Sequence, residues 1–350
     1  MDKVLPTIDI KYLLKQFQID DDFIGIKAYG SGLINHTWKV VTSGNEYILQ
    51  KVNTDVFHSP EIISSNIQVI ANYLQEINSD YLLVAPIKMK SGKDLLQVEN
   101  ESVYRLIPFI QNSYSKTSVE SGMQAYEAAK QFGKFTATLS GVNLSKLKPS
   151  IPNFHNLPLR FEEFTIALNS CNSERLQTAS DLINKLLSYS DIVNKYEQIV
   201  EDPAFNLRVT HHDAKISNVL FDANEKGICI IDLDTVMPGY FISDVGDMMR
   251  TYLSPVTEEE KDFSKIVIRD DFYHAIVDGY MSEMKNELTA KEKEHFFYAG
   301  KFMIYMQALR FATDYLNGDK YYGASYPDHN LNRAMNQVTL LERFVEKKLY

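Results

Sequence analysis

The residues best suited to chemistry lie in one short segment of the 350-residue chain. Asp213 and Asn218 are followed by two short apolar runs, at 219–221 and 228–231, and then by Asp232. The stretch between the runs contains Asn and Gly, which favour a tight turn, so we predict a β-hairpin. Because a hairpin brings its two outer ends together, we expect these three polar side chains to meet.

Carboxylate and amide oxygens suit Mg²⁺, a hard cation that proteins hold with one or two carboxylates and substrate phosphates. Phosphoryl transfer needs such a metal, a carboxylate that accepts the proton of the attacking hydroxyl, and a cation beside the moving group. Asp213, Asn218, Asp232 and the nearby Lys215 are residues of these types. The segment therefore predicts transfer of a phosphoryl group from a nucleotide.

An antiparallel sheet is predicted ahead of this segment. Residues 24–53 contain runs of β-forming residues separated by Gly and Asn turns. The sequence Ser59-Pro60-Glu61 has the features of a helix start, and we expect this helix to reach about residue 74. Apolar runs at 81–88 and 103–110 would complete a sheet of about five strands with one main helix.

The pattern changes after residue 110, where helical periodicity becomes dominant. Residues 122–140 predict one helix and residues 296–316 another, whereas the proline-containing stretch 144–159 predicts a connecting loop. We therefore expect an α+β protein with two lobes, residues 1–107 and residues 108–350.

The overall composition narrows the possible functions. A net charge of −10 argues against general binding to nucleic acid, which needs a basic surface. The two cysteines, Cys171 and Cys229, are in no zinc-binding pattern and favour a reducing compartment. No stretch resembles a signal peptide or reaches the length of about 20 apolar residues that a membrane span needs. We expect a cytoplasmic protein, and the sequence favours no particular oligomeric state.

The segment resembles the catalytic loop of the protein-kinase and aminoglycoside-phosphotransferase superfamily, His-x-Asp-x-x-x-x-Asn. His211, Asp213 and Asn218 match it at each position, and Lys215 stands where protein kinases have a lysine. The resemblance implies a two-lobed kinase-like fold with a small antiparallel N-lobe and a mainly helical C-lobe. It also implies that Asp213 is the base, that Lys215 steadies the phosphoryl group of ATP, and that Asn218 and Asp232 bind Mg²⁺.

Two parts of the first lobe are candidates for nucleotide binding. A glycine-containing turn between two predicted strands allows backbone amides to approach phosphates. Its candidate residues are Gly30, Ser31, Gly32 and Asn35. By the family pattern, the adenine would lie against the hinge at 106–110 and bond to its backbone, with Pro108 and Ile110 as the candidates.

The family also places a phosphate-binding cation on the strand at 47–51. Lys51 has the required charge, but one step along a strand reverses the direction of the side chain. A different register would therefore turn Gln50 inward. The usual Lys–Glu pair with the following helix, in which Glu61 is the candidate acid, would then be missing.

Several segments resemble the N-acetylhexosamine 1-kinases, which phosphorylate the anomeric hydroxyl of GlcNAc and GalNAc. The resemblance extends over most of the chain, and its segments are residues 30–35, 47–50, 151–155, 231–239, 310–319, 329–333 and 336–337. It implies a sugar substrate bound by Asp213, and our candidates for further sugar contacts are Arg310, His155, Tyr321 and Tyr322. For the two tyrosines, ordinary core packing is an equally good interpretation.

Other readings remain open from the sequence. A kinase of the same fold could act on an aminoglycoside, a choline-like compound or an amino alcohol, and a nucleotide-binding pseudokinase could act as a regulator. Asp234 could contact a second ion or cap its loop. Asp244 and Asp247 fit a role in anchoring the catalytic loop and starting a helix better than a role in chemistry.

Overall fold

The computed structural model describes residues 6, 8–30, 34–98 and 102–349. The chain forms two compact units. The first contains Met1–Ser113, Val142–Pro152 and Cys229–Met237, and the second contains the remainder. The expected boundary between residues 107 and 108 falls inside a strand of the first unit, Ser102–Pro108. Two later segments of the chain also belong to that unit.

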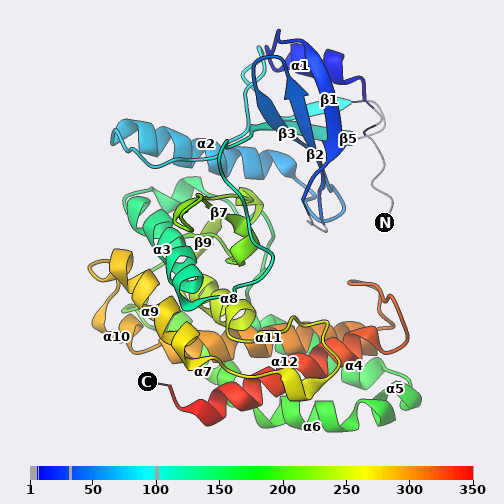
Figure 1. Cartoon of the computed structure of the whole chain (residues 1–350). Coiled ribbons are helices and arrows are strands. Elements are labelled where there is room, and N and C mark those ends of the chain that lie inside the picture. Colours follow the sequence, from blue (N-terminus) through cyan, green and yellow to red (C-terminus); the bar gives the residue numbers. More distant parts are fainter. Residues whose placement is uncertain (1–5, 7, 31–33, 99–101, 350) are drawn as a thin grey trace. The chain divides into compact units, whose positions relative to one another are not determined.

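The first unit contains a five-stranded antiparallel sheet (Figure 1). Its strands lie in the order β1-β2-β3-β5-β4. Their bounds are Phe23–Ala28 for β1, His36–Thr42 for β2, Glu46–Val52 for β3, Leu96–Val98 for β4 and Ser102–Pro108 for β5. Helix α2, Pro60–Glu76, follows β3 and confirms the predicted helix.

The predicted strand at 81–88 is wrong. These residues form no regular structure, and the short strand β4 takes the edge position instead. Pro86 lies in the middle of the run and has no N–H to give to a sheet. Ile87 still donates its N–H to Leu106 at 2.7 Å, so the segment runs beside β5 without forming a ladder.

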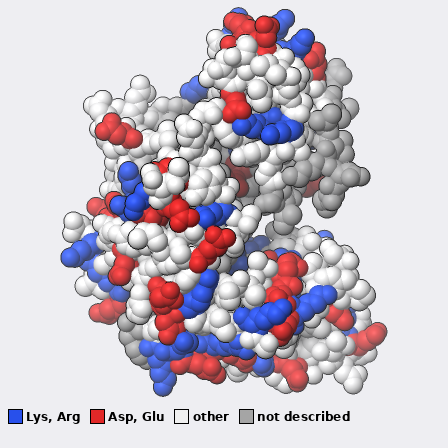
Figure 2. Space-filling model, viewed as in Figure 1, with Lys and Arg blue, Asp and Glu red and all other residues white. Residues whose placement is uncertain are grey.

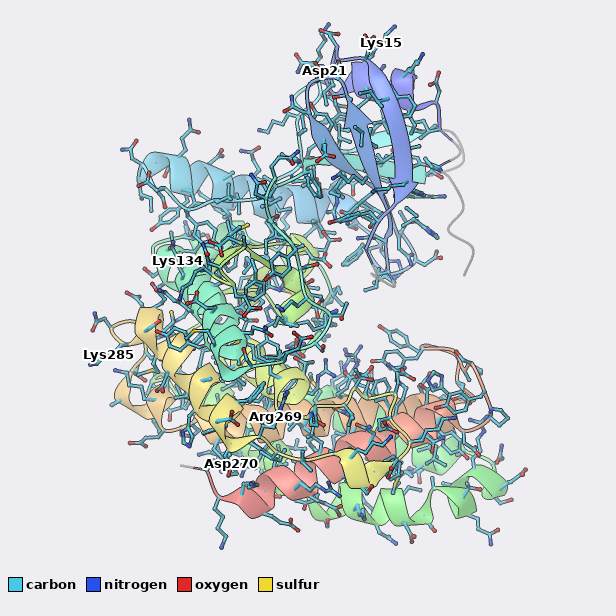
Figure 3. The ribbon with its side chains drawn as sticks, viewed as in Figure 1. Lys15, Asp21, Lys134, Arg269, Asp270 and Lys285 are labelled. Atoms are coloured by element: carbon cyan, nitrogen blue, oxygen red, sulfur yellow. The ribbon has the colours of Figure 1, made fainter. Side chains whose placement is uncertain are left out.

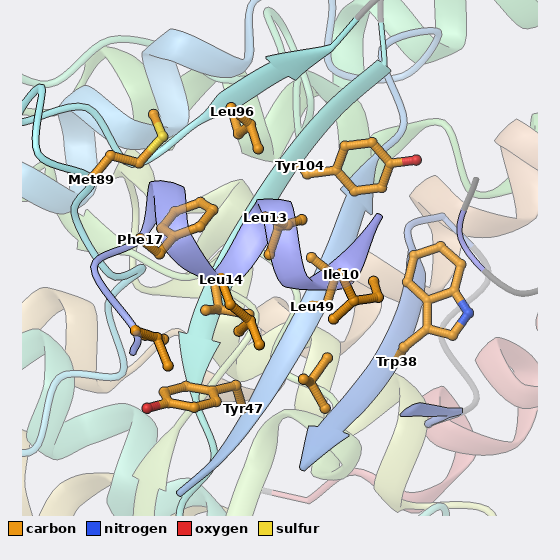
Figure 4. Packing of buried hydrophobic residues seen from close by; sticks show 13 residues of the cluster. Ile10, Leu13, Leu14, Phe17, Trp38, Tyr47, Leu49, Met89, Leu96 and Tyr104 are labelled. Atoms are coloured by element: carbon orange, nitrogen blue, oxygen red, sulfur yellow. The ribbon is translucent and has the colours of Figure 1, made fainter. Parts of the chain in front are cut away.

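One face of the sheet is covered by α1, Ile10–Gln16, a helix that our sequence reading did not predict. Leu13, Leu14 and Phe17 of this segment pack with buried sheet residues that include Leu49 and Tyr104 (Figure 4). Burial of these apolar side chains stabilises the unit. Because side chains alternate along a strand, sheet residues an odd number of positions from Leu49 point to the other face.

The second unit is mainly helical. Its principal helices are α3 Gly122–Thr138, α8 Ile242–Tyr252, α9 Asp270–Met284, α11 Phe296–Leu316 and α12 His329–Lys347. Helix α3 packs on α9, and α11 packs on both α8 and α12. At Gly279 of α9 an added Cβ would collide with the carbonyl of Tyr126, so the close approach of α9 to α3 depends on glycine. The predicted helices at 122–140 and 296–316 are confirmed.

Shorter elements complete the fold. The helices are α4 Leu157–Ser170, α5 Ser173–Thr178, α6 Ser180–Ser188, α7 Asp191–Glu201 and α10 Ala290–Lys293. Single 3₁₀ turns span Leu144–Lys146, Ile216–Asn218, Leu233–Thr235 and Phe263–Lys265. The strands are β6 Arg208–Thr210, β7 Val219–Phe221, β8 Gly227–Ile230 and β9 Met237–Gly239, paired as β6-β9 and β7-β8.

The predicted hairpin is the pair β7-β8, which confirms it. Its turn is closed by the bond from Asp222 N–H to the carbonyl of Lys226 at 2.9 Å. The Asp222 carboxylate also accepts the N–H groups of Asn224 and Lys226, at 2.8 and 2.9 Å. The local turn chemistry therefore specifies this element.

Charged side chains of both signs are mixed over the visible face (Figure 2). Among the charged residues that Figure 3 labels, Arg269 and Asp270 lie at the start of α9. The Arg269 guanidinium donates to the carbonyls of Val119 and Ser254, and Asp270 forms an ion pair with Lys347 of α12 at 2.8 Å. Among the helices in the described part of the chain, none is both long and apolar enough to cross a membrane.

Candidate active site

One buried carboxylate holds the loop that follows β6. Asp244, in the first turn of α8, accepts the backbone N–H of His211 at 2.9 Å and that of His212 at 2.7 Å. His212 has a left-handed backbone, with φ at 65°, which is unfavourable for a residue with a side chain and needs such support. Asp244 therefore anchors the loop, as the sequence predicts.

The Asp244 carboxyl leads to a prediction for the pH dependence of catalysis. Burial raises its pKa to about 6, although the His211 charge and the N–H groups of both histidines act in the other direction. As the pH falls through about 6, an acceptor oxygen becomes a hydroxyl and holds the loop less well. We expect kcat to fall below this pH, and a pH–rate profile at saturating substrates would show it.

A control separates this effect from the titration of other groups. In Asp244→Asn the inflection near pH 6 should disappear, and its persistence would assign it to another residue.

The pH dependence of stability should have the opposite sign to that of kcat. Because the folded pKa is raised above 3.8, the contribution of Asp244 to the free energy of unfolding decreases as the pH rises from about 4 to about 6.

The anchored loop brings together three of the predicted residues. Asn218 Nδ2 donates to the Asp213 carboxylate at 3.0 Å and to the Asp213 carbonyl at 2.8 Å. The Lys215 ammonium lies 3.0 Å from the same carboxylate, whose side chain is 26% exposed. Both bonds of Asn218 use the amide nitrogen, so the amide oxygen is the atom that a metal could take. The Asp213 carboxylate is therefore held by two side chains and remains partly exposed to solvent.

Asp232 belongs to the first unit, in which it follows β8. Its backbone is left-handed, with φ at 62° and ψ at 61°. Aspartate is among the residues that tolerate this conformation best. The shared binding of one ion by Asp232 and Asn218 stays a prediction.

The first unit also shows what Asp234 does. Both of its oxygens accept from Arg105 of β5, at 2.5 and 2.9 Å, and one also accepts from Asn35 Nδ2 at 2.8 Å. Both side chains of the ion pair are only 3% exposed. Burial acts to lower the pKa of Arg105, but the charge and hydrogen bonds of Asp234 raise it overall. Of the two roles considered for Asp234, these contacts favour a structural one in its loop.

The register of β3 decides which of two neighbouring residues meets this pair. Gln50 lies opposite Arg105 of β5, and Lys51 lies opposite Tyr104. The Gln50 amide oxygen accepts from Arg105 Nε at 2.8 Å. Lys51 is two positions from Leu49, so its side chain points to the face that α1 covers. The register therefore places Gln50, and not Lys51, beside the loop at 232–236 that carries Asp234, called the acidic loop below.

The glycine turn and the hinge are described in part. Gly30 has φ at 72°, a conformation natural to glycine, whereas Ser31 and Gly32 lie outside the described residues. Asn35 accepts the N–H of Asn53 at 2.9 Å, in addition to its bond with the acidic loop. The Asn35 amide therefore links the end of the glycine turn to Asp234 of the acidic loop and to Asn53, which follows β3.

The hinge begins where β5 ends. Pro108, the last residue of β5, has only its carbonyl to offer an adenine. Phe109 N–H is bonded to the carbonyl of Glu46 at 3.1 Å, and Ile110 O accepts the Ser113 hydroxyl at 2.6 Å. Adenine binding at Pro108 and Ile110 stays a prediction.

The four candidate sugar contacts lie in the second unit, and three of them cluster. The Arg310 guanidinium is 5.9 Å from the ring of Tyr321 and 5.5 Å from that of Tyr322. Tyr321 is 71% exposed. Tyr322 also faces Arg333 at 5.3 Å, and its hydroxyl accepts from Gln307 at 3.3 Å. Tyr322 is thus a packed ring, and Tyr321 is open to solvent.

His155 is connected to this cluster through Phe154, whose ring stacks on that of His155 at 4.5 Å and lies 5.6 Å from Arg310. The His155 ring also meets that of His212 edge to face at 5.1 Å. Burial, together with the charges of His212 and Arg310, lowers the pKa of His155 well below its usual range. The lowered pKa favours the neutral form of His155, whose buried Nδ1 has no hydrogen-bond partner among the described residues.

Carboxylates near this cluster are bonded to cations or to backbone N–H groups. Arg250 of α8 binds Asp247 at 2.9 Å and Glu258 at 2.8 Å, and Glu258 also pairs with Arg333 of α12. Asp314 of α11 accepts the N–H groups of two loop residues, Tyr321 at 2.7 Å and Tyr322 at 2.9 Å. These bonds fix the loop that carries the tyrosines.

Our sequence reading missed Arg105 and Arg250 as members of these networks. Each sits in an apolar stretch, Arg105 in 103–110 and Arg250 next to two methionines. A charged residue in an apolar run indicates a buried partner, so this signal was available. The identity of the partner could not be predicted for Arg105, because that partner lies far away in the sequence.

Comparison with known proteins identifies the family. The model of the phosphotransferase enzyme family matches residues 25–262, more than half of the chain. The chain belongs to this family. The match includes the anchored loop and the hairpin, so this phosphotransferase carries its candidate base and metal ligands inside the matched region.

Solved structures agree with this phosphotransferase in fold. An aminoglycoside phosphotransferase from Alicyclobacillus acidocaldarius is 11% identical, with a TM-score of 0.62 over 98% of this chain and 97% of the other. A choline kinase from Cryptosporidium parvum is 16% identical, with a TM-score of 0.61 over 97% of each chain. A spectinomycin phosphotransferase bound to AMP is 15% identical, with a TM-score of 0.59 over 97% and 99%. The predicted α+β kinase-like fold is confirmed.

Proposed function

We propose that this phosphotransferase transfers the γ-phosphoryl group of Mg·ATP to the anomeric hydroxyl of an N-acetylhexosamine, GlcNAc or GalNAc. The observation that carries the kinase assignment is the Asp213 carboxylate, held by the Asn218 amide and the Lys215 ammonium in an anchored loop. A positioned carboxylate of this kind is what the transfer requires of the protein. The products are a sugar 1-phosphate and ADP.

Asp213 acts as the general base in this reaction. The sugar oxygen attacks the γ-phosphorus while its proton passes to the Asp213 carboxylate. The bond from the γ-phosphorus to the bridging oxygen breaks, and its electron pair leaves with ADP. Lys215, beside the base, balances the charge of the moving phosphoryl group. The reaction needs no covalent enzyme intermediate.

The metal ligands in this proposal are the amide oxygen of Asn218 and the carboxylate of Asp232. Both are hard oxygen donors, which fits Mg²⁺. When bound, Mg²⁺ supplies positive charge to the nucleotide phosphates. The turn at Gly30, Ser31, Gly32 and Asn35 would face those phosphates, and the hinge would receive the adenine.

The residues around Arg310 favour an uncharged acceptor. The carboxylates of Glu258 and Asp314 already have cationic or N–H partners, and Asp247 pairs with Arg250 through Oδ1, although its buried Oδ2 has no hydrogen-bond partner among the described residues. A cationic acceptor needs carboxylates that are not committed in this way. A sugar instead needs hydrogen-bond donors and an aromatic face, which Arg310 and the exposed Tyr321 ring supply.

A panel of acceptors would test the proposal. ADP release would be measured by a coupled assay with GlcNAc, GalNAc, choline, ethanolamine and spectinomycin, each with and without Mg²⁺. We expect kcat/KM to be highest for an N-acetylhexosamine and the reaction to need Mg²⁺. The product should be a 1-phosphate, which hydrolyses in mild acid.

Other results would select another function. Preferential turnover of choline, an amino alcohol or an aminoglycoside would favour the alternative of a same-fold kinase for that acceptor. Nucleotide binding without turnover of any acceptor would instead favour a pseudokinase regulator.

A further inference from the structure

The loop at 232–236 is attached to the sheet of the first unit by a buried ion pair. The bond from Arg105 to Asp234 is bidentate, which restricts both the distance and the orientation of the loop. The two side chains are each 97% buried, so solvent and salt screen the pair little. Asp234 is two positions after Asp232, the candidate metal ligand.

Two amides orient the pair. The Gln50 oxygen accepts from Arg105 Nε at 2.8 Å, and the Gln50 nitrogen donates to the Thr37 hydroxyl at 3.3 Å. On the acidic side, Asn35 donates to Asp234 at 2.8 Å. The bonds to Gln50 and Asp234 use three of the five N–H groups of the guanidinium. A lysine could not make this set of bonds, because it lacks the planar fork.

The other end of the loop is held by α2. Asn66, which is 1% exposed, donates to the carbonyl of Val236 at 3.0 Å and to that of Lys148 at 2.7 Å. It also accepts the N–H of Lys148 at 2.9 Å. Glu61, the acidic residue in the first turn of α2, is exposed. Among the residues that the structure describes, helix α2 therefore holds the loop through a neutral amide, and not through an ion pair.

We propose that Arg105 is a positioning residue for the loop at 232–236, which carries the candidate metal ligand Asp232. Arg105 acts through Asp234. The pair of Arg105 and Asp234 takes the place that the sequence suggested for a lysine on β3 paired with Glu61. Gln50 stands at the strand position that faces the loop, and its amide orients the arginine that supplies the charge. The cation thus comes from β5, and the acid comes from the loop itself. This inference rests on the proposed function, because its effect is exerted on Mg·nucleotide.

Three variants test this role. Arg105→Met and Asp234→Asn each leave one partner of a buried pair alone and risk poor folding. The double variant removes both charges and should fold more readily. For each purified protein we would measure the dissociation constant of Mg·ADP by calorimetry, and the Mg²⁺ concentration that gives half-maximal activity.

The expected result is a weaker response to Mg²⁺. Partners that orient metal ligands typically contribute 10–100-fold to metal affinity. We expect both constants to rise by roughly this factor in the double variant, with the acceptor KM unchanged. Because the two residues act as one unit, the double variant should show a smaller rise than the product of the single effects.

A control on the same sheet checks specificity. Asp21 (Figure 3) accepts the Thr42 hydroxyl of β2 at 3.1 Å, and Asp21→Asn also removes a carboxylate from this unit. It should leave both Mg²⁺ constants at the parental value. A purely structural role for Arg105 would lower the melting temperature and the folded fraction without changing either constant.

The outcomes separate this inference from the proposed function. A folded double variant that keeps the parental dissociation constant of Mg·ADP and the parental half-maximal Mg²⁺ concentration would overturn the role of Arg105. This holds even if the parent phosphorylates GlcNAc. A parent that binds Mg·ADP but ignores sugars would refute the acceptor, and the Mg·ADP constants would still decide the role of Arg105. A parent that binds no Mg·ADP would overturn both.

Discussion

Replacing Asp213 with asparagine should lower kcat by roughly 10²–10⁴-fold, the range that a general base contributes. Asparagine has nearly the same size and can still hydrogen-bond to Asn218, but it cannot accept a proton from the acceptor hydroxyl. The dissociation constant of ADP should stay close to the parental value, because the base acts on the acceptor. The measurements are steady-state ADP release and calorimetric binding of ADP.

The matched control for this prediction is Asp222→Asn. Asp222 lies in the turn of the same hairpin and bonds to backbone N–H groups there. This variant should lose some stability and keep its kcat. Turnover close to the parental rate in Asp213→Asn would remove the residue from its role as base, and equal losses in both variants would point to general damage of the hairpin.

Removing the Asp232 carboxylate should nearly abolish Mg²⁺-dependent turnover. Metal stabilisation of the transferred group is worth several kcal/mol, which corresponds to a loss of roughly 10³-fold. Glycine is the appropriate replacement, because the left-handed backbone at position 232 would strain alanine. The measurement is ADP release over a titration with Mg²⁺.

Two comparisons make this result specific. Asp232→Asn keeps an oxygen and tolerates the same backbone, so it should recover part of the activity at high Mg²⁺. Glu225→Gly changes another left-handed residue, φ 60°, in the turn of the hairpin, and should behave like the parent. An unchanged Mg²⁺ requirement in Asp232→Gly would exclude Asp232 as a metal ligand.

Elements with local signals were predictable from the sequence. The helix at 296–316 was predicted with the bounds that α11 has, because its apolar residues recur at helical spacing. The hairpin was predictable from two short apolar runs and a turn. The run at 81–88 misled us, since apolar character alone does not show whether a segment joins a sheet or lies beside it.

Non-local pairing was not predictable in the same way. The partners Arg105 and Asp234 are 129 positions apart, so neither the spacing of the residues nor their types could match them. The buried pair of Arg208 and Glu292 is a second case, with 84 positions between its partners. Folding brings these groups together, and burial then makes their pairing necessary.

The chemistry of this phosphotransferase could be read from its primary structure, because the loop with Asp213, Asn218 and Lys215 is contiguous and its residue types belong to one reaction. The choice between Gln50 and Lys51 could not, since a shift of one residue in the register of β3 exchanges their faces. That choice rests on the packing of α1 against Leu49 and its neighbours, a contact between distant parts of the chain.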